Sequence, residues 1–260
     1  MAQDGVAGRA VSQPARWSSE RAFYTGAAVA IVGAVVLGFS RTFFFRAWYP
    51  DWARAHGAPE PFFYLHGAVF AAWLLLLVAQ TSLVAAGRVD LHRRLGVAGA
   101  GLAVAMVLLG TVGALMAASR PTGFIDVPVP PLKFLVVPFA DLGLFAAFVS
   151  LALAKRRRSQ SHKRLMLLAT LSLAEAGVAR WPFALMATPL PVPGIGMTEL
   201  CLDLFLVPLL VWDLASRGRP HPVTLWGGAA LIASQPLRFM LMGSDAWIAF
   251  AGWAVSLLPG

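Results

Sequence analysis

The stretch that decides the fold is residues 64–96, YLHGAVFAAWLLLLVAQTSLVAAGRVDLHRRLG. Its apolar part is long enough to cross a bilayer once, since about 20 helical residues rising 1.5 Å each span a hydrocarbon core of roughly 30 Å. A histidine lies near each end of the stretch, and arginines gather at its second end only. Later apolar segments repeat parts of this pattern, so the sequence predicts a membrane protein built of helices.

The composition agrees with an integral membrane protein. Of the 260 residues, 58% are hydrophobic and only 13% are charged, whereas soluble domains carry about 25% charged residues. The net charge of +9 is explained by Lys and Arg in cytoplasmic loops, so we expect the lipid bilayer as a partner and no nucleic acid. The one cysteine, Cys201, excludes an internal disulfide and any site built from several cysteines.

Seven apolar runs are each near the length of a membrane span. They cover residues 23–43, 62–86, 96–118, 132–154, 165–187, 197–215 and 223–243. We therefore expect an all-α, polytopic transmembrane bundle of about seven spanning helices, forming one domain over residues 22–243. Residues 1–21 are predicted to be a disordered cytoplasmic tail. Residues 244–260 are predicted to form a short apolar helix that is interfacial or re-entrant, an eighth span being the alternative.

The basic residues predict the orientation of the bundle. With the N-terminus inside, the inner segments hold Arg9, Arg16, Arg21, Arg88, Arg93, Arg94, Lys155, Arg156, Arg157, Arg158, Lys163, Arg164, Arg217 and Arg219. The outer loops hold Arg46, Arg54 and Arg120, with Arg41 and Lys133 at helix ends. By the positive-inside rule, we expect a cytoplasmic N-terminus in the inner (plasma) membrane of a bacterium.

Polar residues inside the apolar runs are costly in a membrane, and they therefore point to function. Counting 1.5 Å per residue places most of them in the middle or the outer half of the membrane. The set is His66, Gln80, Asp141, Glu175, Arg180, Glu199, Asp203 and Arg238. One interpretation is a polar cavity that opens toward the outer face. The other is a set of salt bridges that only fix packing, Glu175 or Asp141 with Arg180 and Asp203 with Arg238.

Three histidines, His92, His162 and His221, lie one in each predicted inner loop. Because neutral imidazole binds haem iron, zinc or copper, they are candidate ligands of haem b or of a divalent metal. The basic residues beside two of them, suited to haem propionates or other anions, are Arg93, Arg94, Lys163 and Arg164. The simpler alternatives are helix caps, contacts with lipid phosphate and, for His221 between two prolines, a tight turn.

The order of several of these residues resembles an uncharacterised family of bacterial multi-pass membrane proteins, classed as a domain of unknown function. The residues that carry the resemblance are His66 and Gln80, then Leu91-His92-Arg93-Arg94-Leu95-Gly96, then Ser161-His162-Lys163-Arg164-Leu165-Met166 and Arg180. The resemblance covers about residues 62–182. It implies a helical fold and important roles for His66, His92, His162 and Arg180, and it implies no reaction. A weaker likeness to haem-b membrane cytochromes rests on histidines at helix ends, although the chain lacks two matched histidine pairs.

Three functions fit these patterns. The first is redox or metal chemistry at His92 and His162, with His221 as a further ligand, and the sequence favours it. The second is binding or transport of a small molecule from the outer face through the polar cavity. The third is a structural or assembly factor without a ligand. The run 223–243 contains no lysine, which argues against a retinal Schiff base, and no G-x-S-x-G, Walker A or H-E-x-x-H motif is present.

Overall fold

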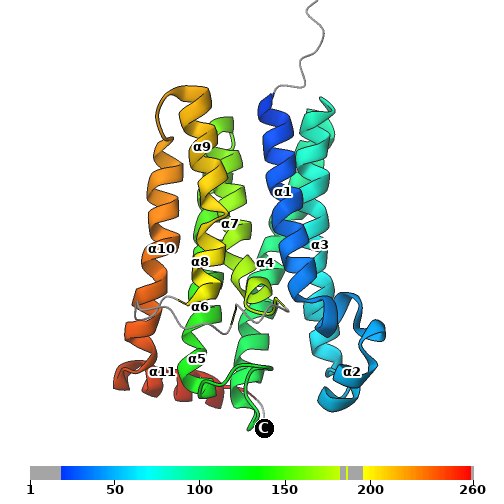
Figure 1. The fold of residues 1–260 in the computed structure, drawn as a ribbon, viewed down its shortest axis with the longest axis vertical. Helices are drawn as coiled ribbons and strands as arrows, with labels where there is room; N and C mark the ends of the chain where they lie inside the picture. The colour runs from blue at the N-terminus through cyan, green and yellow to red at the C-terminus, as the bar shows by residue number, and fades with distance from the viewer. Residues whose placement is uncertain (1–18, 182–185, 187–195, 259–260) are drawn as a thin grey trace, which may run out of the picture.

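The computed structural model describes residues 19–181, 186 and 196–258, and every regular element in them is a helix (Figure 1). The α-helices are α1 (Ser19–Gly38), α2 (Pro50–His56), α3 (Pro61–Ala85), α4 (Val89–Ser119), α5 (Pro131–Phe134), α6 (Val136–Ala154), α7 (Ser159–Val178), α8 (Met197–Asp203), α9 (Leu206–Arg217), α10 (Pro222–Met242) and α11 (Asp245–Ser256). A π-helical turn, η1 (Ser40–Phe44), and a 3-10 turn, η2 (Arg46–Trp48), follow α1. The predicted all-helical fold is confirmed for the described residues.

Helix α7 forms the centre of the bundle. It packs against α1, α6, α8 and α10, and twelve of its twenty residues are buried. Helices α3 and α4 pack against each other and against α1 and α6 respectively. In Figure 1, α7 lies between the helices α9 and α10 on one side and α1 and α3 on the other. The stretch at 64–96 thus forms a flank of the bundle, and α7 forms its core.

Local sequence explains several helix ends. Pro61 and Pro222 occupy the first positions of α3 and α10, where the missing N–H would have no helical partner. Gly218 ends α9 with a φ of +70°, a left-handed conformation that glycine adopts at little cost. Pro208 lies in the first turn of α9. The helical conformation is interrupted just before it, between Asp203 and Leu206. The single predicted run 197–215 is therefore two helices, α8 and α9.

Helices α1 and α7 approach each other closely at two glycines. A Cβ atom on Gly38 would overlap the carbonyl oxygen of Gly177, and a Cβ on Gly177 would lie 2.9 Å from the Cα of Val35. Such small residues allow two backbones in a membrane to touch. The indole Nε1 of Trp181 donates a hydrogen bond of 2.9 Å to the carbonyl of Ala34 at the same crossing. This hydrogen bond joins the last turns of α1 to the segment that follows α7.

Four helical segments are long and apolar enough to cross a membrane: α1, α3, α4 and residues 131–154, which combine α5 and α6. These are the features of a membrane protein. The predicted run 165–187 coincides only in part with a described helix, because α7 covers 159–178 and most of 182–187 lies outside the described residues. Of the predicted tail, residues 1–18 also lie outside them, whereas 19–21 already belong to α1.

Helix α11 packs across the end of the bundle, against α4 and α5 (Figure 1). Its twelve residues extend about 18 Å, which is too short to cross a bilayer. Ser244 caps it by accepting a hydrogen bond from the backbone N–H of Trp247, whose indole donates to the carbonyl of Leu132 at 2.9 Å. The C-terminal segment is thus a helix held against the ends of other helices.

Polar contacts join the opposite end of the bundle. Glu20 at the start of α1 forms an ion pair with Lys163 at the start of α7, and Arg21 donates to the carbonyl of Ala85 at the end of α3. In Figure 1, the beginnings of α1 and α10 lie at this same end. The described parts of the segments predicted to be cytoplasmic therefore lie together.

Candidate functional site

Three charged side chains from three helices meet inside the bundle. Nη1 of Arg238 on α10 donates to Oδ1 of Asp141 on α6 at 2.9 Å, and its Nη2 donates to Oε2 of Glu175 on α7 at 2.7 Å. The three side chains are only 6–9% exposed. The planar guanidinium, with its several donors, lets one arginine bridge two carboxylates. We call these residues the buried charge cluster.

The two acidic residues of α8 accept hydrogen bonds and form no ion pair with described residues. Oδ1 of Asp203 accepts from the amide of Gln235 at 2.9 Å, and Oε2 of Glu199 accepts from the backbone N–H of Gly196 at 2.8 Å. The predicted ion pair of Asp203 with Arg238 is therefore wrong. Helix α10 turns Gln235 toward α8 and, three residues later, turns Arg238 toward α6 and α7.

A cavity of about 510 Å³ lies between α3, α4, α6, α7 and the segment that follows α1. Four of the predicted cavity residues form part of its wall, namely His66, Asp141, Glu175 and Arg180. The other four, Gln80, Glu199, Asp203 and Arg238, are not part of that wall. Aromatic side chains that the sequence did not single out supply much of the rest: Phe39, Phe43, Phe44, Phe63, Phe70, Trp73, Phe124, Phe134 and Trp181. The cavity is thus more apolar than predicted, as small-molecule pockets usually are.

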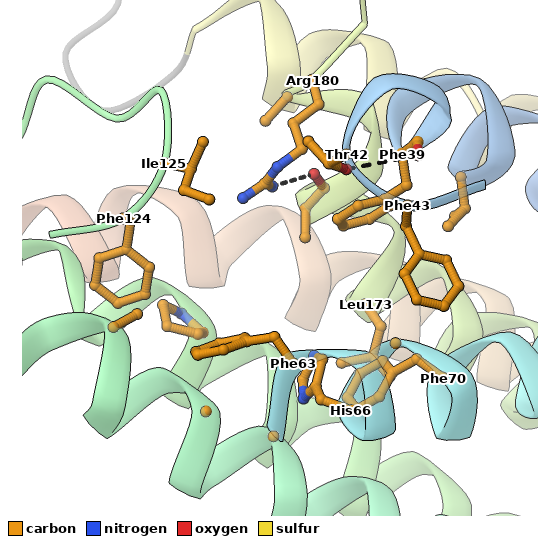
Figure 2. A pocket seen from close by; sticks show the side chains of 18 of the residues that line it. Phe39, Thr42, Phe43, Phe63, His66, Phe70, Phe124, Ile125, Leu173 and Arg180 are labelled. Carbon is orange, nitrogen blue, oxygen red and sulfur yellow. Dashed lines mark hydrogen bonds between the residues drawn. The ribbon is translucent and has the colours of Figure 1, made fainter. Parts of the chain in front are cut away.

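Arg180 follows the last turn of α7, and its guanidinium points into the cavity (Figure 2). Its Nη1 donates to the carbonyl of Ala176, and the group lies 5.0 Å from the ring centre of Phe39. No carboxylate of the described residues lies within ion-pair distance of it. The predicted pairing of Arg180 with Glu175 or Asp141 is therefore wrong, because Arg238 takes both carboxylates.

The cavity wall also includes the charged residues Arg41, Arg120 and Asp126. Arg120 donates to Oε1 of Glu60 at 2.6 Å. Asp126 lies 3.5 Å from a ring nitrogen of His56. Arg41 forms no ion pair within the described part of the chain. The wall therefore contains two cations that form no ion pair in that part of the chain, Arg41 and Arg180, and Asp126 acts on Arg180 only from a longer distance.

His66 lies on the opposite wall from Arg180, beside Phe63 and Phe70 (Figure 2). Its ring stacks on Phe70 with 4.3 Å between ring centres, and its Nδ1 lies 3.4 Å from the carbonyl oxygen of Leu109. A Cβ atom on Gly113 would lie 3.3 Å from that same nitrogen. The glycine on α4 thus leaves the space that the imidazole occupies.

A second cavity, of about 330 Å³, runs along α1, α7 and α9. We call it the apolar groove, and its wall includes Phe23, Ile31, Leu168, Phe205 and Leu209. No charged side chain is among its described wall residues. In composition it resembles a surface for lipid chains.

His92 on α4 and His162 on α7 lie together at the end of the bundle where α1 begins. Their rings meet edge to face, with centres 6.3 Å apart. Nδ1 of His162 lies 2.9 Å from the carbonyl oxygen of Ala152, so this nitrogen carries the proton and Nε2 remains an acceptor. Nδ1 of His92 and the side-chain oxygen of Gln80 are buried without a hydrogen-bond partner among the described residues. Both rings thus retain nitrogen acceptors.

Asp213 on α9 organises a buried network that the sequence analysis missed. Its Oδ1 accepts from Nε of Arg164 at 3.1 Å, and its Oδ2 accepts from the backbone N–H of His221 at 2.9 Å and from the hydroxyl of Thr224 at 2.5 Å. The side chains of Arg164 and Asp213 are completely buried. Asp213 could have been identified from the sequence, because it lies inside the apolar run 197–215 and polar residues inside such runs point to function.

This network removes two residues from the predicted cofactor site. Arg164 faces Asp213 inside the bundle and is not available to a propionate. His221 caps α10, because its Nδ1 accepts a hydrogen bond of 3.0 Å from the backbone N–H of Val223. Burial, together with the nearby charges of Arg164 and Arg217, lowers the pKa of His221. The neutral ring is the form that this cap requires.

Within the described residues, no three side chains of His, Cys, Asp or Glu are grouped closely enough to hold a metal ion. The three-histidine arrangement is thus not formed there: His92 and His162 lie together, whereas His221 belongs to the Asp213 network. Arg93 and Arg94 are exposed beside His92.

Comparison with known proteins adds no assignment. No family model, no curated protein and no solved structure matches the chain. The resemblance carried by the histidine motifs therefore stays a prediction, and the function is argued from the geometry of the site.

Proposed function

We propose that the protein is a membrane-embedded binding or transport protein for a small, largely apolar molecule that carries one anionic group. The observation that carries this proposal is the cavity of about 510 Å³, mostly apolar and lined by Arg180, which forms no ion pair with a carboxylate of the described residues. An unpaired cation inside a membrane protein is costly, and an anionic ligand offsets that cost. A carboxylate or phosphate also matches the planar fork of a guanidinium.

The charges of the cavity wall favour an anion over a cation. Arg41 and Arg180 form no direct ion pair within the described residues, although Asp126 acts on Arg180 from a longer distance, and Arg120 is already paired with Glu60. The two carboxylates at the inner part of the wall are held by an arginine from outside the cavity. A bound cation would be repelled by Arg41 and Arg180, and of the wall carboxylates only Asp126 is not held by an arginine.

The apolar wall defines the rest of the ligand. Pockets for small molecules usually enclose about 300–1,000 Å³ and bind most of the ligand through apolar and aromatic contacts. Phe63, Phe70 and Trp73 offer such contacts in this cavity. A single-chain fatty acid such as dodecanoate combines an apolar body with one carboxylate, and it is the probe that we choose.

The membrane topology in this proposal has seven spans and a cytoplasmic N-terminus in the plasma membrane of a bacterium. Helices α7 and α10 pack beside the four segments that are apolar enough to span, Trp212 of α9 stacks on Phe23 of α1, and the basic loops gather at one end. The positive-inside rule then makes that end cytoplasmic and turns the cavity toward the outer face. A C-terminal alkaline phosphatase fusion should be active and a C-terminal green fluorescent protein fusion dark; the reverse result would contradict this topology.

The test of the binding function uses radiolabelled dodecanoate and protein reconstituted in nanodiscs. Wild type should bind one dodecanoate, and Arg180→Gln should weaken binding at least tenfold, because a charge-assisted hydrogen bond contributes roughly 1.5–3 kcal/mol. Dodecanol, which lacks the carboxylate, should bind both proteins equally. Arg54→Gln is the matched control, since Arg54 is exposed and paired with Asp51 outside the cavity. Equal dodecanoate binding by wild type and Arg180→Gln would refute the proposal.

A second candidate function, metal binding, is favoured by the contact between His92 and His162. The two ring centres lie 6.3 Å apart, which suits a nearly linear nitrogen–metal–nitrogen arrangement with bonds of about 2.0 Å, whereas tetrahedral zinc would require the rings to move about 1 Å closer. The backbone acceptor on Nδ1 of His162 is of the kind that orients metal-binding imidazoles. The His92→Ala/His162→Ala double variant should lose bound zinc, copper or haem, measured by mass spectrometry and by the visible spectrum. His56→Ala, on the exposed α2, is the control; equal metal content in all three proteins would exclude this site.

A further inference from the structure

The buried charge cluster contains more acid than base. Asp141 and Glu175 share the single guanidinium of Arg238, and each uses one oxygen for it. The second oxygen of each carboxylate has no hydrogen-bond donor among the described residues. With both carboxylates ionised, the cluster carries one net negative charge although its side chains are only 6–9% exposed. Burial of an uncompensated charge costs several kcal/mol, and a carboxylate avoids that cost by taking up a proton.

The surroundings of the cluster increase this excess of negative charge. The charged side chains that act on the two carboxylates from the neighbouring helices are Arg238 on α10 and the acidic residues of α8, Glu199 and Asp203. None of the charges that act most strongly on them belongs to the described part of α1 or α4. Like charges at short range in a medium of low dielectric disfavour full ionisation.

A hydrogen-bond donor is also missing next to Asp203, at Gln235 on the same helix as Arg238. Gln235 is only 3% exposed, and its amide nitrogen donates to Asp203. Its amide oxygen is buried without a partner among the described residues. Ionised carboxylates cannot donate a hydrogen bond, whereas a protonated one can. The amide oxygen of Gln235 lies in the group that contacts Asp203, so within the described residues it adds a further unsatisfied oxygen to the acidic side of the region, and the excess of carboxylates over cations at Arg238 carries the argument for a proton.

We propose that Asp141 and Glu175 form a proton-binding site that holds one proton at neutral pH, and that this proton is coupled to anion binding in the cavity. The proton site is independent of the ligand, whereas the coupling rests on the proposed function. Both carboxylates lie on the cavity wall, and Arg238 lies behind them. Solvent or ligand in the cavity can therefore reach the protonated groups directly.

The sign of the coupling follows from electrostatics. When the proton leaves, the cavity wall gains a negative charge, and an anionic ligand binds more weakly. By linkage, the proton raises the affinity for the anion by the same factor by which the anion raises the affinity for the proton. Anion and proton thus enter and leave the cavity together, which is the behaviour of a proton-coupled transporter rather than of a passive binding pocket.

Infrared difference spectroscopy of the purified protein tests the proton site without any ligand. Wild type at neutral pH should show the carbonyl stretch of one protonated, buried carboxylic acid, and the band should shift on exchange into heavy water. Asp141→Asn and Glu175→Gln should each abolish the band, because the remaining carboxylate then forms a one-to-one pair with Arg238. No band in wild type, or an unchanged band in both variants, would overturn the proton site.

Two further variants test whether the protonated group is another carboxylate than Asp141 or Glu175. Asp203→Asn, which removes a carboxylate of α8, should keep the infrared band. If Asp203→Asn lost the band while Asp141→Asn and Glu175→Gln kept it, the proton would belong to Asp203 and the proposal would be overturned. Asp51→Asn, which changes an exposed carboxylate, is the control for purification. If Asp141→Asn and Glu175→Gln fail to fold, the presence or absence of the band in wild type and in Asp203→Asn still decides.

The coupling is tested by measuring dodecanoate affinity over a range of pH. In wild type, affinity should fall as pH rises, and calorimetry in two buffers of different ionisation enthalpy should show uptake of about one proton on binding in the alkaline range. In Asp141→Asn and Glu175→Gln, the affinity should be constant over the same range. A wild-type affinity independent of pH would overturn the coupling. Absence of any dodecanoate binding would overturn the proposed function and with it the coupling, and the infrared band would still test the proton site.

Discussion

Arg238 holds two carboxylates at once, so its loss affects the protein more than the loss of either partner. In Arg238→Met, Asp141 and Glu175 are left buried without a cation, and removing one partner from a buried pair costs about 3–5 kcal/mol. In Asp141→Asn or Glu175→Gln, the remaining carboxylate keeps its arginine, and the loss should be smaller. Thermal unfolding in one detergent should rank Arg238→Met as the least stable of the three. An Arg238→Met protein with the melting temperature of wild type would contradict the buried charge cluster.

His221 predicts a pH dependence of stability. An unfolded histidine has a pKa of about 6.5, and burial lowers the pKa of His221 in the folded protein. Between these two values the unfolded chain binds more protons, so stability rises with pH and is lost as pH falls through this window. Protonation also removes the Nδ1 acceptor that caps α10.

The variant His221→Asn isolates this effect, because the asparagine oxygen can cap the helix and does not titrate. Its melting temperature should fall less than that of wild type when pH is lowered below about 6.5. The same fall in both proteins would show that His221 does not contribute.

At the scale of residues, the sequence predicted which side chains matter better than it predicted their partners. Asp141, Glu175 and Arg238 stand out because charge is rare inside apolar runs. Their pairing depends on which helices are neighbours and how each is rotated, and no residue spacing within one helix contains that information. Arg180 belonged to a polar cavity in one interpretation and to a salt bridge in the other, and it points into the cavity. Asp213 was overlooked, although its position inside an apolar run was visible.

Among the helices, the contact of α1 with α7 depends on the absence of side chains at Gly38 and Gly177. In Gly38→Ala, the added methyl overlaps the carbonyl of Gly177, so the backbones must separate. Overpacking of this kind costs typically about 1–3 kcal/mol, and we expect a lower melting temperature. Gly33→Ala is the matched control, because a Cβ there meets nothing within 4 Å. Equal stability of the two variants would contradict the close approach.

Helix positions were predictable because apolar length and proline positions are local properties. Pro61 and Pro222 begin helices close to the predicted starts of two runs. The division of the run 197–215 into α8 and α9 was not expected, since hydropathy stays high across the break. The central place of α7 was also not evident, because its buried face includes Arg164 and Glu175, which lower its mean hydropathy.

At the scale of the whole molecule, the two ends of the bundle differ in chemistry. One end gathers the basic loops, the pair of His92 and His162 and the network of Asp213. Toward the other end, the cavity lies between α3, α4, α6 and α7, with the buried charge cluster on its inner side. Composition predicted the membrane and the asymmetry of charge. The volume and the aromatic wall of the cavity arise from packing between distant segments, and therefore required the structure.

The measurement that tests the central claim most directly is a crystal structure of the protein with a fatty acid that carries bromine at the end of its chain. Anomalous scattering locates the bromine without assuming where the ligand binds. We predict one bromine inside the cavity near Trp73 and Met106, with the carboxylate at Arg180. Bromine only in the apolar groove along α1, α7 and α9, or only on the lipid-facing surface, would contradict the proposal that this cavity is a binding site.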